Sequence, residues 1–147
     1  MKKPPNNETC SQAVSESELV RLLTQMLRDE GYRVRLEVSN MGQSVDLVAT
    51  QGRWVTAIEA KLSDWRRALV QCRTHESVAD YVCVAIGSLS VPSGLFKAAH
   101  ELGYGVLHFK RTEAKFKWEV RPRLNSKLWK PQRRYWSRAL RRVPYAY

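Results

Sequence analysis

An apolar stretch that reads SVDLVATQGRWVTAIEAK carries two acids and a lysine: Asp46, Glu59 and Lys61. Glu59 and Lys61 are two positions apart, so in a strand their side chains leave the same face. Gln51 and Gly52 form a predicted turn between two strands, and the resulting hairpin could place Asp46 beside the other two residues. The pattern therefore predicts two acids and one lysine gathered on one face of a sheet.

Two carboxylates a few ångströms apart repel each other, and a divalent cation between them removes that repulsion. Hard carboxylate oxygens suit Mg²⁺ or Mn²⁺, with water or phosphate in the remaining positions. Such a cation polarises a phosphate and lowers the pKa of a bound water. Lys61 would then orient or deprotonate that water, or stabilise charge on the phosphate. These residue types therefore suit hydrolysis of a phosphodiester.

Two simpler interpretations compete with this chemistry. Glu59 and Lys61 could belong to a polar strand face that meets solvent. They could also form a cross-strand salt bridge, which contributes only about 0.2–1 kcal/mol when it is exposed. The secondary structure predicted around these residues therefore helps to distinguish a catalytic site from an ordinary polar surface.

The first predicted element is an amphipathic helix at 15–30. Its apolar residues follow helical spacing and make one stripe. Ser15 is the expected N-cap, with Glu18 completing a capping box, and Gly31 is the expected C′ residue. A strictly alternating strand at 32–38 follows.

The remaining elements complete an alternating pattern. After a loop at 39–43 come hairpin strands near 44–50 and 53–61, then a helix at 62–73 with Ser63 as N-cap. A nearly continuous apolar run at 79–86 predicts a strand covered on both faces, as in a parallel arrangement. A helix at 94–102 and a strand at 104–109 follow. The order α-β-β-β-α-β-α-β predicts an α/β fold, a mixed sheet flanked by helices.

Asp46, 12 intervening residues and then Glu59-Ala60-Lys61 resemble the PD-(D/E)XK nuclease superfamily, which has the restriction-endonuclease-like fold. The resemblance covers roughly residues 15–109. The segments ESELVRLL, GYRV, SVDLVA and IEAKLS are similar to archaeal Holliday-junction resolvases and to Mrr-like restriction enzymes. The resemblance to the PD-(D/E)XK superfamily implies that Asp46 and Glu59 hold Mg²⁺, that the Ala60 carbonyl is a further ligand, and that Lys61 assists the attacking water. Val45 stands where the motif's name has proline.

The resemblance also implies a role for Gln71, ten residues after Lys61 on the predicted second helix. Several branches of the superfamily place a glutamine there, near the site. The RecB-like branch has a tyrosine four residues later, where this chain has His75. An exposed helix glutamine without any role in the site is the competing interpretation.

A helix acid is the last site residue that the resemblance implies. At 100° per residue, Glu16 lies about 50° from the centre of the apolar stripe and Glu18 about 110°. We therefore expect Glu16 to be the site residue and Glu18 to be the capping acid. Both would also be favoured at a helix N-terminus by the helix dipole alone.

The net charge of +11 lies entirely in the last 38 residues, which contain 13 Lys/Arg and two Glu. Such a basic segment predicts a polyanionic partner, here DNA. Its tryptophans and tyrosines could stack on bases or pack on the body. The expected nucleic-acid-binding cations are Arg121, Arg123, Lys127, Lys130, Arg133, Arg134, Arg138, Arg141 and Arg142.

The expected organisation is a disordered lead-in at 1–14, a nuclease core at 15–109 and a basic, aromatic-rich extension at 110–147. Cys10, Cys72 and Cys83 form no CxxC pair, which argues against a disulfide framework or zinc site and favours a reducing, cytoplasmic location. The histidines also lack ligand spacing. No apolar run is long enough to predict a membrane span.

The sequence therefore predicts a Mg²⁺- or Mn²⁺-dependent deoxyribonuclease, and an endonuclease in particular. The alternative is a non-catalytic nucleic-acid-binding subunit of a DNA-processing assembly that has kept the nuclease fold. A pure binding protein gains nothing from carboxylates near phosphate, which favours the enzyme. The sequence leaves open whether the chain forms a homodimer or joins a larger complex.

Overall fold

The computed structural model describes residues 14–147. The expected lead-in at 1–14 therefore lies outside the described residues, apart from Val14. Six strands form one sheet in the order β1-β2-β3-β4-β5-β6. Their bounds are β1 Arg33–Asn40, β2 Gln43–Gln51, β3 Trp54–Lys61, β4 Tyr81–Ile86, β5 Gly105–Lys110 and β6 Lys115–Val120.

The sheet is mixed, as the element order predicts. The pairs β1–β2 and β2–β3 are antiparallel, β3–β4 and β4–β5 are parallel, and β5–β6 is antiparallel. The parallel centre explains the continuous apolar run of β4, since both of its faces are covered. The predicted α/β class, a mixed sheet flanked by helices, is confirmed.

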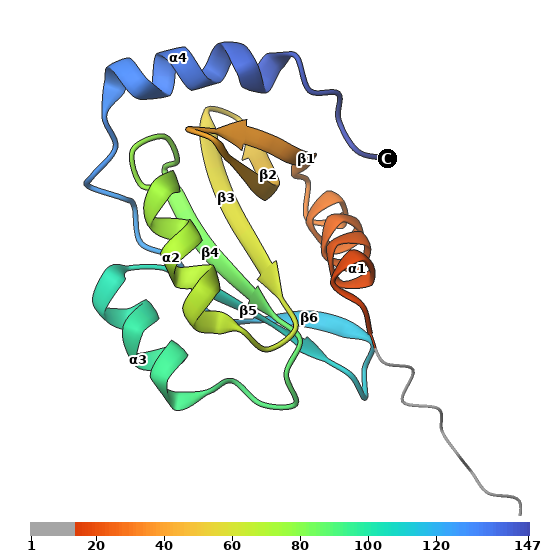
Figure 1. The fold of residues 1–147 in the computed structure, drawn as a ribbon. Coiled ribbons are helices and arrows are strands. Elements are labelled where there is room, and N and C mark those ends of the chain that lie inside the picture. The colour runs from red at the N-terminus through yellow and green to blue at the C-terminus, as the bar shows by residue number, and fades with distance from the viewer. Residues whose placement is uncertain (1–13) are drawn as a thin grey trace, which may run out of the picture.

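Within residues 14–147, four helices cover the two faces of this sheet (Figure 1). Helix α1 (Glu16–Asp29) packs on one face, and α2 (Trp65–His75), α3 (Ser93–Leu102) and α4 (Lys130–Arg141) lie on the other. Each face therefore has its own apolar cluster. Leu19, Leu23 and Leu27 of α1 pack against one face, whereas the buried side chains of α2, α3 and α4 belong to the cluster on the opposite face.

The ends of α1 follow the sequence signals closely. The Ser15 hydroxyl accepts a hydrogen bond from the Glu18 backbone N–H at 3.1 Å, which is one half of the predicted capping box. The Glu18 carboxylate lies 3.5 Å from Arg21. Gly31 takes a positive φ of 92°, and its N–H reaches back to the helix, as a C′ glycine does.

Two local predictions need correction. Helix α2 is capped by Asp64, whose carboxylate accepts from the Arg67 N–H at 3.2 Å, and Ser63 lies one residue outside the cap. The expected loop at 39–43 is only a two-residue turn, Met41-Gly42, because β1 and β2 extend to meet it. Both turn residues have positive φ, which closes a tight hairpin.

The β1–β2 hairpin changes its orientation at the level of Asp46. Leu47 packs on the α1 face, whereas Val45 packs on the face of α2, so the alternation of the strand reverses between them. On β1, Glu37 lies opposite this point and has a positive φ of 52°. This irregularity turns the tip of the hairpin toward α2 and separates β2 from β3, whose pairing ends at Leu47–Ile58.

The basic extension docks on the body. Strand β6 completes the sheet, and α4 lies along β1 with Trp136 only 2% exposed. The Trp136 indole N–H donates to the Ser39 carbonyl at 3.0 Å, and the Ala146 N–H donates to the Val34 carbonyl at 2.7 Å. The C-terminal residues therefore cover the open edge of β1, which would otherwise expose unpaired backbone groups.

Among residues 14–147, none of the helices has the length and apolar character that crossing a membrane requires.

Candidate active site

Asp46 and Glu59 meet where β2 and β3 separate. The Asp46 Oδ2 atom accepts a hydrogen bond from the Ala60 N–H at 2.9 Å, so the carboxylate occupies the place of a sheet hydrogen bond. Because the N–H and C=O of one strand residue point to the same side, the Ala60 carbonyl also faces β2. The side-chain and backbone oxygens named by the sequence therefore converge at this separation.

Glu59 and Lys61 leave the face of β3 that carries α2, as their spacing predicts. Ile58 and Ala60 pack against α1 on the opposite face. Glu59 is 0% exposed. Its Oε1 atom lies 2.7 Å from Nε2 of His75 at the C-terminal end of α2, whereas its Oε2 atom is buried and has no partner among the described residues.

His75 is held in one tautomer by Asn40. The Asn40 amide nitrogen lies 3.3 Å from the Thr74 carbonyl and 3.2 Å from His75 Nδ1. A carbonyl only accepts, so the Asn40 nitrogen must point at it, and the same nitrogen then donates to Nδ1. Nδ1 is therefore an acceptor, and Nε2 carries the proton and donates it to Glu59.

Burial shifts the pKa of Asp46, Glu59 and His75. Burial and, after it, the neighbouring Glu59 carboxyl raise the pKa of Asp46 to about 6, against the opposing effects of the Ala60 N–H and the Lys61 charge. Burial also raises the pKa of Glu59. It lowers the pKa of His75 to about 4, which agrees with the neutral imidazole inferred from Asn40. Two adjacent carboxyls thus resist ionising together.

A groove of ≈ 690 Å³ opens beside Asp46, between the start of β2 and α2. Gln71 lines it and has a buried Oε1 atom with no partner among the described residues. The exposed side chains of Arg66 and Arg67 form its rim. The structure therefore brings Gln71 to the same groove as Asp46 and adds two cations that could meet a phosphate.

The donors at this site fit a hard divalent cation. Oδ1 of Asp46, Oε2 of Glu59 and the Ala60 carbonyl are oxygen atoms of the kind that bind such a cation, and a cation would offset the burial and the Glu59 charge that raise the pKa of Asp46. Within residues 14–147 no three His, Cys, Asp or Glu side chains group as a metal site. Waters and substrate phosphate would have to complete the coordination, which is the usual arrangement for Mg²⁺.

Glu16, the acid expected from the first helix, lies near the end of β3 that carries Glu59, but it makes no described contact with the site. Gly87 donates to the Lys61 carbonyl at 3.0 Å and packs closely against Leu19 in the first turn of α1. Glu16, three residues earlier, is therefore near the carboxyl end of β3. It is exposed. Among the described residues no hydrogen bond or ion pair joins Glu16 to Asp46 or Glu59.

The nine cations predicted to bind nucleic acid, all within residues 121–142, divide into three groups. Arg123 donates to the His100 carbonyl, Lys127 lies 3.3 Å from Glu76, and Arg133 binds Val78 and Asp80, so these three tie the extension to the body. Arg121 lies over the Trp118 ring. The other five are exposed, and within the described residues their side chains form no hydrogen bond or ion pair: Lys130, Arg134, Arg138, Arg141 and Arg142.

These five cations, which we call the basic stripe, share one side of α4. At 100° per residue they fall within an arc of about 120°. Trp136 and Leu140 lie on the opposite side and are buried, and the helix contains no acidic residue. Trp129 and Tyr135 are 61% and 72% exposed near the stripe. Burial of the apolar side therefore fixes the direction in which the cations point.

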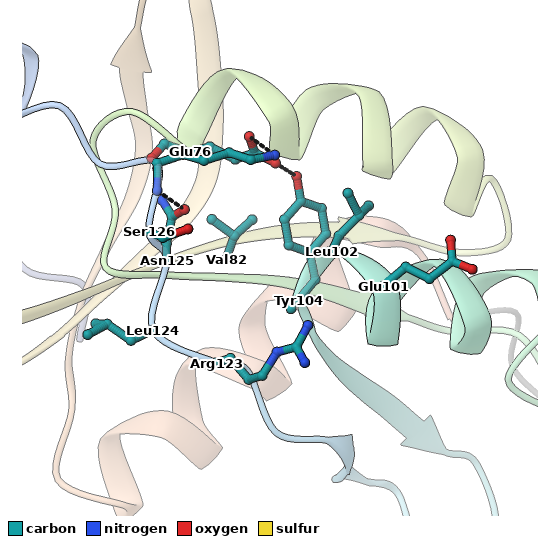
Figure 2. A pocket seen from close by; sticks show the side chains of 11 residues that line it. Glu76, Val82, Glu101, Leu102, Tyr104, Arg123, Leu124, Asn125 and Ser126 are labelled. Carbon is teal, nitrogen blue, oxygen red and sulfur yellow. Dashed lines mark hydrogen bonds and ion pairs between the residues drawn. The ribbon is translucent and has the colours of Figure 1, made fainter.

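A second pocket, of ≈ 360 Å³, lies at the connector between β6 and α4 (Figure 2). Figure 2 shows the Tyr104 hydroxyl pointing at the Glu76 carboxylate, to which it donates. Glu76 also pairs with Lys127, and Asn125 donates to the Glu76 and Ala79 carbonyls. These polar groups satisfy one another, so the pocket serves to anchor the connector.

No protein-family model and no curated protein matches this chain. A solved structure of a protein of unknown function from Silicibacter pomeroyi is similar, with a TM-score of 0.64 and 21% identity over 86% of this chain and 87% of that one. This likeness shows a shared fold. An XisH family protein from Nostoc punctiforme (TM-score 0.49, 14% identity, 68% of this chain and 97% of that one) and an fdxN element excision controlling factor protein from Anabaena variabilis (0.48, 16%, 71% and 98%) are more distant.

The sequence did not reveal the two arginines at the rim of the groove, nor His75 and Asn40 behind Glu59. The sequence places His75 four residues after Gln71, and such spacing puts both on one side of a helix. This signal was available. Asn40 could not be found in this way, because only the folded hairpin tip brings it to the end of α2.

Proposed function

We propose that this protein is a metal-dependent DNA nuclease, and specifically an endonuclease. The observation that carries the proposal is the pairing of two buried, adjacent carboxyls, one of them with an unpartnered oxygen, beside a groove rimmed by arginines. The Asp46, Glu59-Ala60-Lys61 resemblance to PD-(D/E)XK nucleases supports the same activity.

The residues divide the work as follows. Asp46, Glu59 and the Ala60 carbonyl would hold Mg²⁺ or Mn²⁺, which polarises the phosphate and acidifies water. Lys61 orients the attacking water or takes up its proton, and Gln71 contacts the groups in the groove. His75 fixes the Glu59 carboxylate by donating from Nε2.

DNA is the proposed partner, and the basic stripe of α4 is the proposed contact to its backbone. A helix with five outward cations and no acid favours phosphates over any neutral ligand. A homodimer or a larger DNA-processing complex would be compatible with this surface. Cys72 and Cys83 are buried free thiols, which supports a reducing, cytoplasmic location.

The test is cleavage of plasmid, linear duplex and four-way-junction DNA, with Mg²⁺ or with EDTA. We expect cutting with Mg²⁺ only, and a loss of at least about 10²-fold in Asp46→Asn, Glu59→Gln and Lys61→Ala. Asn and Gln keep an acceptor for the Ala60 and His75 N–H groups, so these variants should stay folded.

Glu101→Gln and Lys97→Ala, exposed on α3, are the matched controls and should cut like the wild type. Cleavage by all three site variants at the wild-type rate would refute the site. DNA binding without any cleavage under Mg²⁺ or Mn²⁺ would instead favour the alternative, a non-catalytic nucleic-acid-binding subunit.

A further inference from the structure

An aromatic pocket of ≈ 270 Å³ lies at the opposite end of β3 from the carboxylates. Trp54 begins β3, whereas Glu59 is near its end. Tyr32, Tyr81 and Trp118 complete the aromatic wall. None of these residues takes part in the proposed metal site, so the pocket needs a separate explanation.

The guanidinium group of an arginine lies over the ring of each tryptophan in this pocket. Arg53 lies over Trp54 at 4.5 Å from the ring centroid, and Arg121 lies over Trp118 at 4.6 Å. Trp54 is 37% exposed, and its ring is 6.0 Å from that of Tyr81 at a 57° tilt. Accessible aromatic rings beside cations are the combination that binds single-stranded nucleic acid, by stacking bases and pairing phosphates.

The size and polarity of the pocket suit one planar heterocycle. Its volume lies below the range of about 300–1,000 Å³ that drug-sized ligands occupy. Trp118 lines the pocket, and its indole N–H is buried without a partner among the described residues. A buried donor gains from an acceptor, and nucleobases carry carbonyl oxygens and ring nitrogens.

The start of α4 also lies near this pocket, although Tyr32 and Trp118 of the pocket belong to the α1 face of the sheet and α4 packs on the other face. Arg133 in the first turn of α4 approaches the Arg53 carbonyl at 3.5 Å, so α4 begins beside the β2–β3 turn that precedes Trp54. Arg133 pairs with Asp80, which neutralises the acid at this junction. A polyanion that leaves the N-terminal end of the stripe would therefore pass Arg53 and turn over the end of the sheet to reach the pocket.

We propose that the aromatic pocket binds an unpaired base of a single-stranded nucleic acid whose backbone continues along the basic stripe. The proposal rests on the proposed function for its class of ligand, but it requires neither metal nor cleavage. It assigns single-stranded or partly unpaired nucleic acid as the preferred ligand of this protein.

The test is fluorescence anisotropy with labelled oligothymidine and with a matched duplex, both in EDTA. Trp54→Ala should weaken oligothymidine binding by about five- to 150-fold, which corresponds to the loss of one base–aromatic stack of about 1–3 kcal/mol. Duplex binding should stay within about twofold. Trp54→Phe keeps a stacking ring and should restore most of the single-strand affinity.

Phe96→Ala, an exposed aromatic on α3, is the matched control and should bind as the wild type does. Circular dichroism checks that each variant is folded. Equal oligothymidine affinity for Trp54→Ala, Trp54→Phe and wild type would overturn the proposal, as would a wild type that binds duplex only. Binding in EDTA followed by no cleavage in Mg²⁺ would sink the nuclease and leave this proposal standing.

Discussion

The buried Glu59 carboxyl is held in place through one oxygen, which leaves its other oxygen without a partner among the described residues. One oxygen receives the His75 N–H and the other has no partner among the described residues. A buried carboxyl with one fixed oxygen cannot rotate freely, so its second oxygen keeps its direction. Such a partner behind a metal ligand typically contributes about 10–100-fold to metal affinity.

His75→Ala should therefore weaken Mg²⁺ binding by about 10–100-fold, because Glu59 loses the donor that orients it. Isothermal calorimetry on the folded variant measures this. His108→Ala removes another buried histidine, which bonds to the Ser88 carbonyl, and serves as the control. Equal Mg²⁺ affinity in His75→Ala and wild type would contradict the orienting role.

The raised pKa of Asp46 predicts a pH-dependent stability for the metal-free protein. The folded pKa is about 6 and the ordinary value 3.8, so the folded state binds the proton more tightly than the unfolded state. Between about pH 4 and pH 6 the free energy of unfolding should therefore fall as the pH rises, and it should stay low above that window.

Asp46→Asn should reduce this slope, and above pH 6 in EDTA it should be more stable than the wild type. Glu59, whose pKa is also raised, would maintain part of the slope. Mg²⁺ should narrow this difference, since tenfold excess over Kd stabilises the wild type by about 1.4 kcal/mol. Urea unfolding across the pH range, with and without Mg²⁺, tests both the pH dependence and the effect of the metal. A wild type more stable than Asp46→Asn in EDTA at pH 7 would argue against the raised pKa of Asp46.

At the scale of elements, α4 is part of the core as well as a carrier of charge. Trp136 and Leu140 pack in the same apolar cluster as Val38 and Val45 of the hairpin tip. The tip in turn holds Asn40 against His75. Docking of α4 therefore supports the hairpin that completes the site, and removing the whole extension would disturb both.

Trp136→Ala should cost about 3–5 kcal/mol of unfolding free energy, as large-to-small changes of buried aromatics do. Trp136→Phe should cost less, since it loses mainly the hydrogen bond to Ser39. Trp129→Ala, at an exposed position, should change the value by about 0.5 kcal/mol or less. Urea denaturation provides the comparison, and similar midpoints for Trp136→Ala and Trp129→Ala would show that α4 is not packed as described.

At the scale of the whole molecule, the charge is divided between structure and surface. Arg123, Lys127 and Arg133 are engaged by the body, so the free positive charge of the extension lies mainly in the basic stripe. A net charge of +11 thus overstates the number of cations available to DNA. The number of exposed cations in the stripe therefore predicts how strongly the proposed DNA binding depends on salt.

Replacing the five stripe residues with glutamine should flatten the salt dependence of duplex binding. Each phosphate contact contributes about 0.9 to the slope of log affinity against log salt, so the slope should fall by up to about 4.5. Arg73→Gln with Lys97→Gln, exposed cations outside the stripe, is the control. Salt titrations by anisotropy in EDTA measure the slope, and a slope unchanged in the five-residue variant would exclude α4 as the contact.

The sequence by itself determined the element order from α1 to β5 and the faces on which Glu59 and Lys61 lie. Periodicity of 3.6 and 2 is a local property, so it predicted α1, the hairpin strands and the opposite orientation of Glu59 and Ala60. The side-by-side position of Asp46 and Glu59 followed from the short turn between their strands. Charge counting likewise located the basic segment, since charge does not depend on the fold.

Only the tertiary structure decided which side chains are available. It paired His75 with Glu59, bound Asp46 to the Ala60 N–H, and took Arg133 into a structural role. These outcomes depend on contacts between residues far apart in the chain and on the backbone reversal near Glu37. No local pattern records them, because burial and hydrogen-bond partners are set by the packing of α2, α4 and the hairpin tip together.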